Sequence, residues 1–144
     1  MAVRIANQAA PGTLLDKRRR SNRVRSDAPG QRKPRERDEA YLKLVRKLPC
    51  LRCGSNLCIA AHVRMSAPGE SPVGIGTKPD DSRVLPLCEW CHTNGMDAQH
   101  RVGETAFYSE LGIDPIKLAK KLYAAKPDIS AMQMIIFKAR KRFA

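Results

Sequence analysis

The sequence contains no long apolar segment. No stretch of this 144-residue chain approaches the roughly eighteen consecutive apolar residues of a membrane-spanning helix. No apolar segment follows Arg4, so the pattern of a secretory signal peptide is also missing. We therefore expect a protein that has no membrane partner and that works in the cytoplasm.

The sequence also lacks nucleotide-binding motifs and internal repeats. Residues 66–78 are rich in glycine and proline, which predicts a loop. No Gly-Lys-Ser/Thr sequence follows these glycines, and no strand-to-helix pattern surrounds them. Both a Walker phosphate loop and a dinucleotide-binding fingerprint are therefore excluded.

Five cysteines are an odd number for a disulfide framework, and a reducing compartment with a metal site fits better. Four of them form two Cys-x-x-Cys pairs, Cys50/Cys53 and Cys88/Cys91, separated by 34 residues. Four thiolates make the closed tetrahedral shell that structural Zn²⁺ takes, so we predict one zinc site. The alternative, four unrelated buried or redox thiols, is disfavoured by the matching spacings. We interpret Cys58 as a small core residue, with a swapped zinc ligand as the alternative.

The chain is strongly basic. It has 27 Lys and Arg against 14 Asp and Glu, for a net charge of +13. The positive charges form runs at residues 17–20, 32–37 and 138–142, and such runs release counterions from a phosphate backbone. We expect nucleic acid as the partner, with a solvated basic surface as the alternative. The N-terminal run has no apolar face, which argues against a membrane surface.

Charge and hydrophobicity divide the chain into three parts. Residues 1–40 hold eleven Lys and Arg against five Asp and Glu and few large apolar side chains, a composition typical of disorder. We predict a disordered basic arm at residues 1–37, a folded domain at 38–125 and a basic C-terminal helix or tail at 126–144. A folded part of about ninety residues is small enough for a metal cross-link to matter.

Periodicity and capping residues predict the secondary structure. Asp38 is an N-cap before apolar positions at helical spacing, which predicts a helix over residues 38–47. Short apolar segments predict strands at residues 58–65 and 83–87. Helical patterns follow at about residues 97–111, 115–125 and 132–143, and Asp114-Pro115 is a cap with a first-turn proline. We expect the last helix to pack on the core.

His92 and His100 are eight residues apart. On one continuous helix they would be separated by ~12 Å, too far to share an ion. Asn94-Gly95 predicts a turn, and a helix that starts after it would allow the two imidazoles to converge. Trp90 lies between the cysteines of the second pair, Cys88 and Cys91. We expect its ring to cover the zinc, with stacking on a base as the alternative.

Several segments occur in the order found in one known family. The ordered set resembles the HNH endonucleases, including the phage recombination-enhancing nucleases, over roughly residues 37–125. The segments that carry the resemblance are Leu48-Pro49-Cys50-Leu51-Arg52-Cys53-Gly54, Ala60-Ala61-His62-Val63-Arg64-Met65, Lys78-Pro79-Asp80-Asp81, Val84-Leu85-Pro86-Leu87-Cys88, Asp97-Ala98-Gln99-His100 and Gly112-Ile113-Asp114-Pro115.

The resemblance implies an α+β fold, with a small ββα-metal HNH domain on a four-cysteine treble-clef zinc site and flanking helices. It implies a phage or prophage endonuclease that hydrolyses DNA phosphodiester bonds in a bacterial cytoplasm, with a recombination protein as a candidate partner. His62 would be the general base and Asp81 would orient it, while His92 and His100 would hold Mg²⁺ or Mn²⁺.

Each of these site assignments has a simpler alternative. His62 could be a structural histidine, His92 could brace the zinc knuckle, and Asp80-Asp81 could be a solvated turn. Arg64 and Lys78 would hold flanking phosphates near His62, or they are ordinary surface charges. The run Arg18, Arg19, Arg20 would bind the DNA backbone without reading its sequence.

The spacing of eight residues between His92 and His100 is one difference from the common HNH pattern, and the chain differs from it at two other positions. Ala61 stands where a metal-binding Asp or His is usual, and Arg83 stands where the middle Asn is usual. These differences support a second hypothesis, a catalytically silent zinc protein that binds nucleic acid as an accessory factor. A third hypothesis is a structural or regulatory zinc protein whose basic tails reach acidic protein partners.

Overall fold

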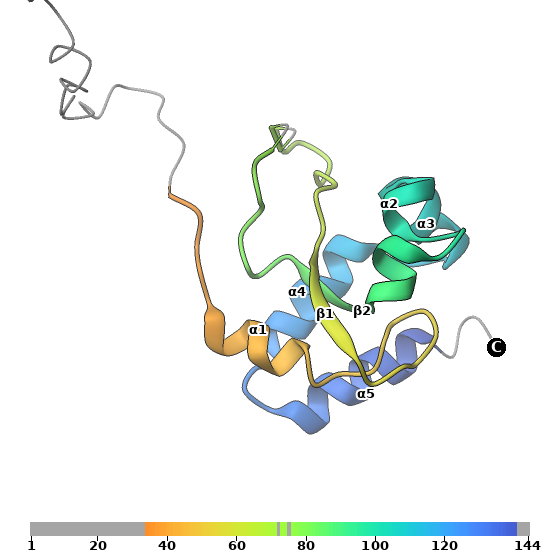
Figure 1. The fold of residues 1–144 in the computed structure, drawn as a ribbon. Helices are drawn as coiled ribbons and strands as arrows, with labels where there is room; N and C mark the ends of the chain where they lie inside the picture. Colours follow the sequence, from red (N-terminus) through yellow and green to blue (C-terminus); the bar gives the residue numbers. More distant parts are fainter. Residues whose placement is uncertain (1–33, 72, 75, 141–144) are drawn as a thin grey trace, which may run out of the picture. The chain divides into compact units, whose positions relative to one another are not determined.

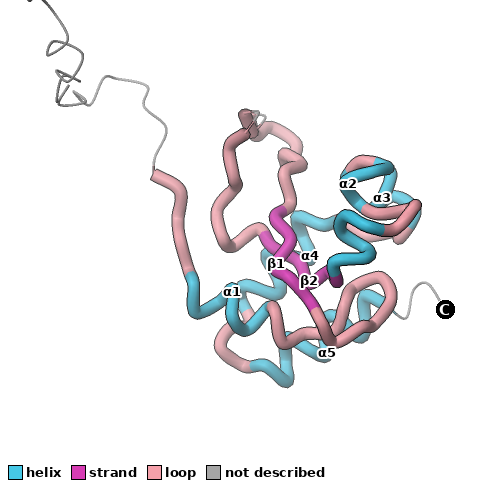
Figure 2. The backbone as a smooth tube through the Cα atoms, in the orientation of Figure 1, coloured by secondary structure: helices cyan, strands magenta, loops and turns pink. Residues whose placement is uncertain are grey.

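A computed structural model describes residues 34–71, 73–74 and 76–140. These residues form a small α+β fold in which helices surround one two-stranded antiparallel sheet (Figures 1 and 2). In chain order the elements are α1 Glu39–Val45, β1 Cys58–His62, β2 Val84–Cys88, the π-helical turn η2 Trp90–Asn94, α2 Gln99–Val102, α3 Glu104–Glu110, α4 Pro115–Ala124 and α5 Ile129–Arg140.

The β1–β2 hairpin is the centre of the fold. Its register pairs Cys58 with Cys88 at one end and His62 with Val84 at the other. The connecting loop therefore leaves the hairpin at the end where His62 lies, opposite the cysteines (Figure 1). Every residue of β2 is buried, whereas β1 is only partly buried, so β2 is the inner strand.

The helix predicted over residues 38–47 and the one predicted over 115–125 are confirmed. The Asp38 side chain accepts a hydrogen bond from the Tyr41 amide and caps α1. Asp114 caps α4 in the same way, accepting from the amides of Ile116 and Lys117. Both caps satisfy amide groups that have no partner within the helix, which fixes where each helix begins.

The helix predicted over residues 97–111 is wrong as one continuous element. Gly103 has φ +88°, in the left-handed region that side chains disfavour, and it separates α2 from α3. The turn predicted at Asn94-Gly95 is confirmed, because η2 ends at Asn94 and Gly95 is extended. The π-helical form of η2 has no sequence signature that we recognised.

The last helix packs on the core, as predicted. Met132 and Ile136 of α5 are fully buried. At the end of α5 the Arg140 guanidinium lies against Gly54, in the space that a side chain at Gly54 would fill. Residues 141–144 of the predicted C-terminal tail lie outside the described residues.

The folded part begins earlier than residue 38. Arg35, assigned to the arm from its charge, forms an ion pair with Asp81, and the Glu36 amide donates to Asp80 Oδ1 at 2.9 Å. These residues belong to the folded part because the segment before α1 supplies hydrogen-bond donors to two carboxylates of the β1–β2 loop, Asp80 and Asp81. Residues 1–33 of the predicted arm lie outside the described residues. In the part of the chain that is described, no helix is both long and apolar enough to cross a bilayer.

Candidate functional site

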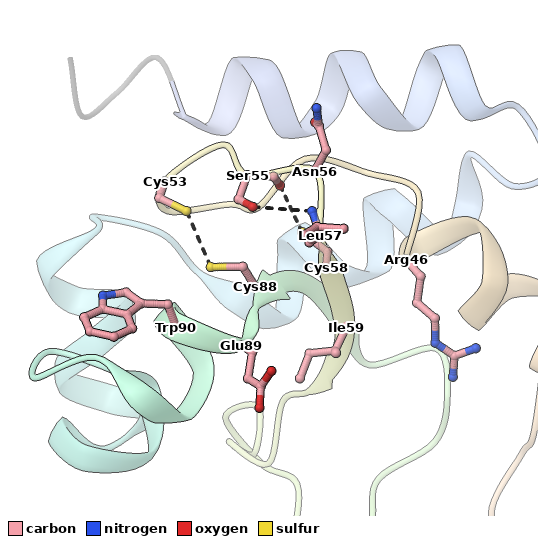
Figure 3. Close-up of a pocket in the computed structure, with 10 residues that line it drawn as sticks. All are labelled: Arg46, Cys53, Ser55, Asn56, Leu57, Cys58, Ile59, Cys88, Glu89 and Trp90. Atoms are coloured by element: carbon pink, nitrogen blue, oxygen red, sulfur yellow. Dashed lines mark hydrogen bonds between the residues drawn. The ribbon is translucent and has the colours of Figure 1, made fainter.

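Four cysteines form one compact cluster. The sulfur atoms of Cys50, Cys53, Cys88 and Cys91 all lie within 4.8 Å of one another. The Sγ atoms of Cys53 and Cys88 are 3.5 Å apart (Figure 3). Tetrahedral Zn²⁺ with bonds of about 2.3 Å needs sulfurs about 3.8 Å apart, so the cluster is compatible with zinc binding. Three of the thiols are buried and Cys53 is exposed.

Local backbone geometry builds the first Cys-x-x-Cys knuckle. The Gly54 amide donates to the Cys50 carbonyl at 2.9 Å, and Gly54 has φ +81°. Glycine adopts that conformation without the strain that a side chain would add. The Leu51 amide donates to the Pro86 carbonyl at 2.9 Å, which joins the first knuckle to β2. Because β2 ends at Cys88, this bond brings the two knuckles together.

Arg52 fixes the same knuckle to α3. Its Nη2 atom lies 3.1 Å from Glu110 Oε1, and its guanidinium carbon lies 5.3 Å from the centre of the Phe107 ring. A guanidinium over an aromatic face adds cation–π attraction to the ion pair. The knuckle is therefore attached both to the sheet and to the helices that follow it.

The Cys50 thiol has a strongly lowered pKa. The neighbouring Cys58 thiol lowers the pKa of Cys50 to about 4, against the opposing effect of burial, and backbone amides add to the lowering. The same neighbour relation raises the pKa of Cys58. Burial, and then the negative charge of Cys50, raises the pKa of Cys91. A dication would compensate the charge that now opposes further deprotonation.

Cys58 lies beside the cluster because the register pairs it with Cys88. It is half-buried, as a residue at the edge of the core, and its thiol also lies 3.3 Å from the Ser55 carbonyl oxygen. It is not a member of the four-thiol group. Its position favours the interpretation as a small core residue over that of a zinc ligand.

His62 and Asp81 form a hydrogen-bonded pair at the other end of the hairpin. His62 Nε2 lies 3.0 Å from Asp81 Oδ1, and Asp81 is only 2% exposed. Asp81 Oδ2 accepts the Asp38 amide at 2.9 Å, and Arg35 pairs with Oδ1. Burial alone would raise the pKa of Asp81. Hydrogen bonds from His62, the Asp38 amide and Arg35 outweigh burial and lower this pKa to about 2.

Glu104 holds the backbone that follows His62. Its Oε2 atom accepts hydrogen bonds from the amides of Arg64 at 2.8 Å and Met65 at 3.0 Å. These bonds tie the end of β1 to the first turn of α3. We did not identify Glu104 or Arg35 from the sequence, because Glu104 is 40 residues from its partner and Arg35 lies in a run of similar charges.

His92 and His100 converge, as the turn at Asn94-Gly95 predicts. Their Nε2 atoms lie 3.0 Å apart and their rings meet edge to face. The Gln99 side chain donates to the Tyr108 hydroxyl at 3.3 Å and is buried, so it anchors α2 and leaves His100 on the surface. Burial, and then the neighbouring His100, lowers the pKa of His92. The lowered pKa favours the neutral imidazole that metal ions bind.

The His62–Asp81 and His92–His100 pairs differ from the cysteine cluster in the number of donors that they offer. Within residues 34–71, 73–74 and 76–140, one group of three or more His, Cys, Asp or Glu side chains is close enough together to share an ion, and it consists of the four cysteines.

The two positions that differ from the common HNH pattern have structural roles. Ala61 is 2% exposed and belongs to the core. Arg83 pairs with Glu70 and donates to the Met65 carbonyl at 3.4 Å, so it does not replace the usual Asn.

The remaining predicted site residues lie on the surface or outside the described chain. Arg64 and Lys78 are exposed, two residues after His62 and three before Asp81, and neither forms an ion pair within the described part. Trp90 is 67% exposed, and both the expectation that it covers the zinc and the alternative that it stacks on a base stay predictions. Its ring lies against Gly95, where the absence of a side chain leaves space. Arg18, Arg19 and Arg20 lie outside the described residues.

Comparison with known proteins gave no match to any protein family, curated protein or solved structure. The resemblance to the HNH endonucleases therefore depends on the ordered sequence segments alone. Besides these segments, the structure has three features of its own: the four-thiol cluster, the His62 imidazole held by Asp81, and the contact between the imidazoles of His92 and His100.

The cluster predicts one tightly held zinc ion for each chain. Replacing any one of Cys50, Cys53, Cys88 and Cys91 by Ser should abolish zinc retention and unfold much of residues 38–125, because structural zinc contributes ~10 kcal/mol or more of apparent binding energy. Elemental analysis and circular dichroism measure both effects. Cys58→Ser is the matched control and should keep its zinc. A folded wild-type protein without zinc, or one whose cluster thiols react freely, would contradict the prediction.

The Asp81 network makes a prediction about stability. Asp81→Asn should lower the free energy of unfolding by about 2 kcal/mol near neutral pH, because each unit of pKa depression corresponds to ~1.4 kcal/mol. The folded pKa lies below the unfolded value of 3.8, so this contribution is complete above that value and is lost as the pH falls toward 2.

Urea denaturation of the zinc-loaded protein near neutral pH should show this difference, because the contribution of the Asp81 carboxylate is complete well above 3.8. Asp80→Asn, which removes an exposed charge and keeps an oxygen acceptor, should have a much smaller effect. Equal effects of the two substitutions would show that the buried network around Asp81 contributes no more to the free energy of unfolding than the exposed Asp80 carboxylate does.

Proposed function

We propose that the chain is a metal-dependent endonuclease of the HNH type that hydrolyses DNA and is built on a structural zinc site. The observation that carries the proposal is the imidazole of His62, held at the end of the hairpin by the buried carboxylate of Asp81. The sequence resemblance extends the proposal to a phage or prophage origin, a bacterial cytoplasm and a recombination protein as partner.

The orientation of His62 suits a general base. Asp81 is ionised at neutral pH and can only accept, so the Nε2 atom that faces it must carry the proton. The Nδ1 atom then keeps its lone pair and can accept a proton from a water molecule. General-base catalysis of this kind contributes ~10²–10⁴ to the rate of a reaction. Asp81 would also stabilise the imidazolium that forms when Nδ1 takes the proton.

The His92–His100 pair offers two donors for a divalent cation. Two ligands at right angles with bonds of about 2.1 Å lie about 3.0 Å apart, which matches the observed separation of the Nε2 atoms. When bound, Mg²⁺ or Mn²⁺ would neutralise charge on the scissile phosphate and on the leaving oxygen. Both ions keep water or phosphate oxygens as further ligands, so two protein donors are compatible with either.

Positive charge supplies the DNA affinity. Arg64 and Lys78 are the exposed cations nearest to His62 and Asp81 in sequence, and both are free to bind flanking phosphates. Residues 1–33 add nine Lys and Arg against two Asp and Glu. Such groups bind a phosphate backbone independently of its sequence and make the affinity depend strongly on salt.

A nicking assay tests the proposal. Supercoiled plasmid incubated with zinc-loaded protein and Mg²⁺ or Mn²⁺ should be nicked, and His62→Ala should reduce the rate by roughly 100-fold or more. Asp81→Asn should give an intermediate loss because the imidazole remains but its orientation is weakened. Each variant must retain zinc and its circular dichroism spectrum, which separates chemistry from folding. Equal cleavage by wild type and His62→Ala would exclude His62 as the base.

The second candidate is a catalytically silent zinc protein that binds nucleic acid. Ala61 offers no ligand in the buried core, and Arg83 is occupied by Glu70 and the Met65 carbonyl. Salt-sensitive DNA binding without cleavage stimulated by metal ions would favour this candidate over the nuclease.

The N-terminal arm makes a separate prediction. Deleting residues 1–33 should weaken DNA affinity and reduce the slope of log affinity against log salt by about 0.9 for each duplex phosphate that the arm neutralises. Nicking at saturating DNA should be unchanged. Deleting residues 1–36 should in addition lower stability, because it removes Arg35 and the Glu36 amide from the Asp81 loop. An unaltered salt slope after the shorter deletion would show that the arm does not bind DNA.

A further inference from the structure

A groove separate from the histidine and cysteine sites lies between α4 and α5. It has a volume of about 360 Å³ and is bordered by the loop before α4 and by facing residues of the two helices. Ligand pockets in proteins begin at about this size. Its position leaves it outside the nuclease proposal and outside the zinc site.

The floor of the groove is apolar. Ile113, Leu118, Ile135 and Ala139 supply it, and Leu118 is only 8% exposed, while the other three are half-buried. A contact that covers these side chains would remove apolar surface from water, which favours binding in proportion to the area covered.

The rim of the groove is positively charged. Lys117 and Lys121 come from α4, about 6 Å apart along the helix, and Lys138 comes from α5. Lys117 lies 3.3 Å from Asp114, whose carboxylate is already used to cap α4. Lys121 and Lys138 are exposed and form no ion pair with other described residues. Two lysines on opposite sides of an apolar hollow are thus free to bind anions.

We propose that this groove binds a short acidic peptide segment of a protein partner that carries one bulky apolar side chain. The apolar side chain would cover the floor between the helices, and the acidic groups beside it would pair with Lys121 and Lys138. A DNA or RNA backbone would meet the lysines but would leave the apolar hollow without a partner. The combination of floor and rim therefore favours a peptide over nucleic acid. The inference does not depend on the nuclease proposal.

A synthetic peptide provides the probe. We choose an acetylated peptide of four aspartates followed by a phenylalanine, with a fluorescent label, and measure its binding to the full zinc-loaded chain by anisotropy. The wild-type protein should bind it, and replacing the phenylalanine by alanine should weaken binding roughly tenfold or more because the floor is no longer covered. The double variant Lys121→Ala/Lys138→Ala should weaken binding of the phenylalanine peptide by a similar factor.

A matched double variant controls for overall charge. Lys43→Ala/Lys47→Ala removes two exposed lysines that do not line the groove, and it should change binding less than twofold. His62→Ala should bind the peptide as the wild type does, which separates this test from that of the nuclease.

Three results would overturn the proposal. The first is a phenylalanine peptide that does not bind. The second is binding that is insensitive to loss of the phenylalanine or of Lys121 and Lys138. The third is an oligothymidylate that binds with dependence on these two lysines while the peptide does not, which would assign the groove to nucleic acid.

Discussion

The contact of four thiols between two distant parts of the chain is the constraint on which the rest of the fold depends. It joins residues 50–53 to residues 88–91 at one end of a hairpin that has only two strands. An isolated two-stranded hairpin is marginally stable in water. A structural zinc ion contributes ~10 kcal/mol or more of apparent binding energy, which is comparable to the whole stability of a typical domain at ~5–15 kcal/mol.

The same constraint explains where the functional groups lie. With the cysteine end of the hairpin fixed, His62 is displayed at the opposite end, four residues along β1 from Cys58. The segment before α1 and the loop before β2 then meet at Asp81, whose carboxylate is satisfied from three sides. On the cysteine side, the chain leaves the second knuckle as η2, and the turn at Gly95 returns His100 to His92.

Local signals in the sequence were sufficient for much of this arrangement. The matched cysteine spacings predicted the cluster, and Asp38 and Asp114 predicted where two helices begin, because each signal involves residues close together in the chain. The convergence of His92 and His100 followed from one Asn-Gly turn. Asp81 was proposed as the partner of His62 from the resemblance, and the structure brings the two side chains into contact.

Features that depend on packing between distant segments could not be predicted from the sequence. Arg35 lies in a run of similar positive charges, and only the fold shows that it contacts Asp81, 46 residues away. Gly103 was hidden inside a helical pattern, although its positive φ divides α2 from α3. The lysines of the α4–α5 groove are far apart in sequence, and only the packing of the two helices brings them to opposite sides of one apolar floor.

X-ray absorption spectroscopy at the zinc edge of the purified protein is the decisive test of the four-cysteine site, because it counts and identifies the atoms bound to the metal. We expect a single shell of four sulfur atoms at about 2.3 Å, with no nitrogen ligand. A mixed shell that contains imidazole nitrogen would mean that His92 or another histidine has replaced a thiolate. Such a result would contradict the separation of a four-cysteine structural site from the His62–Asp81 and His92–His100 pairs.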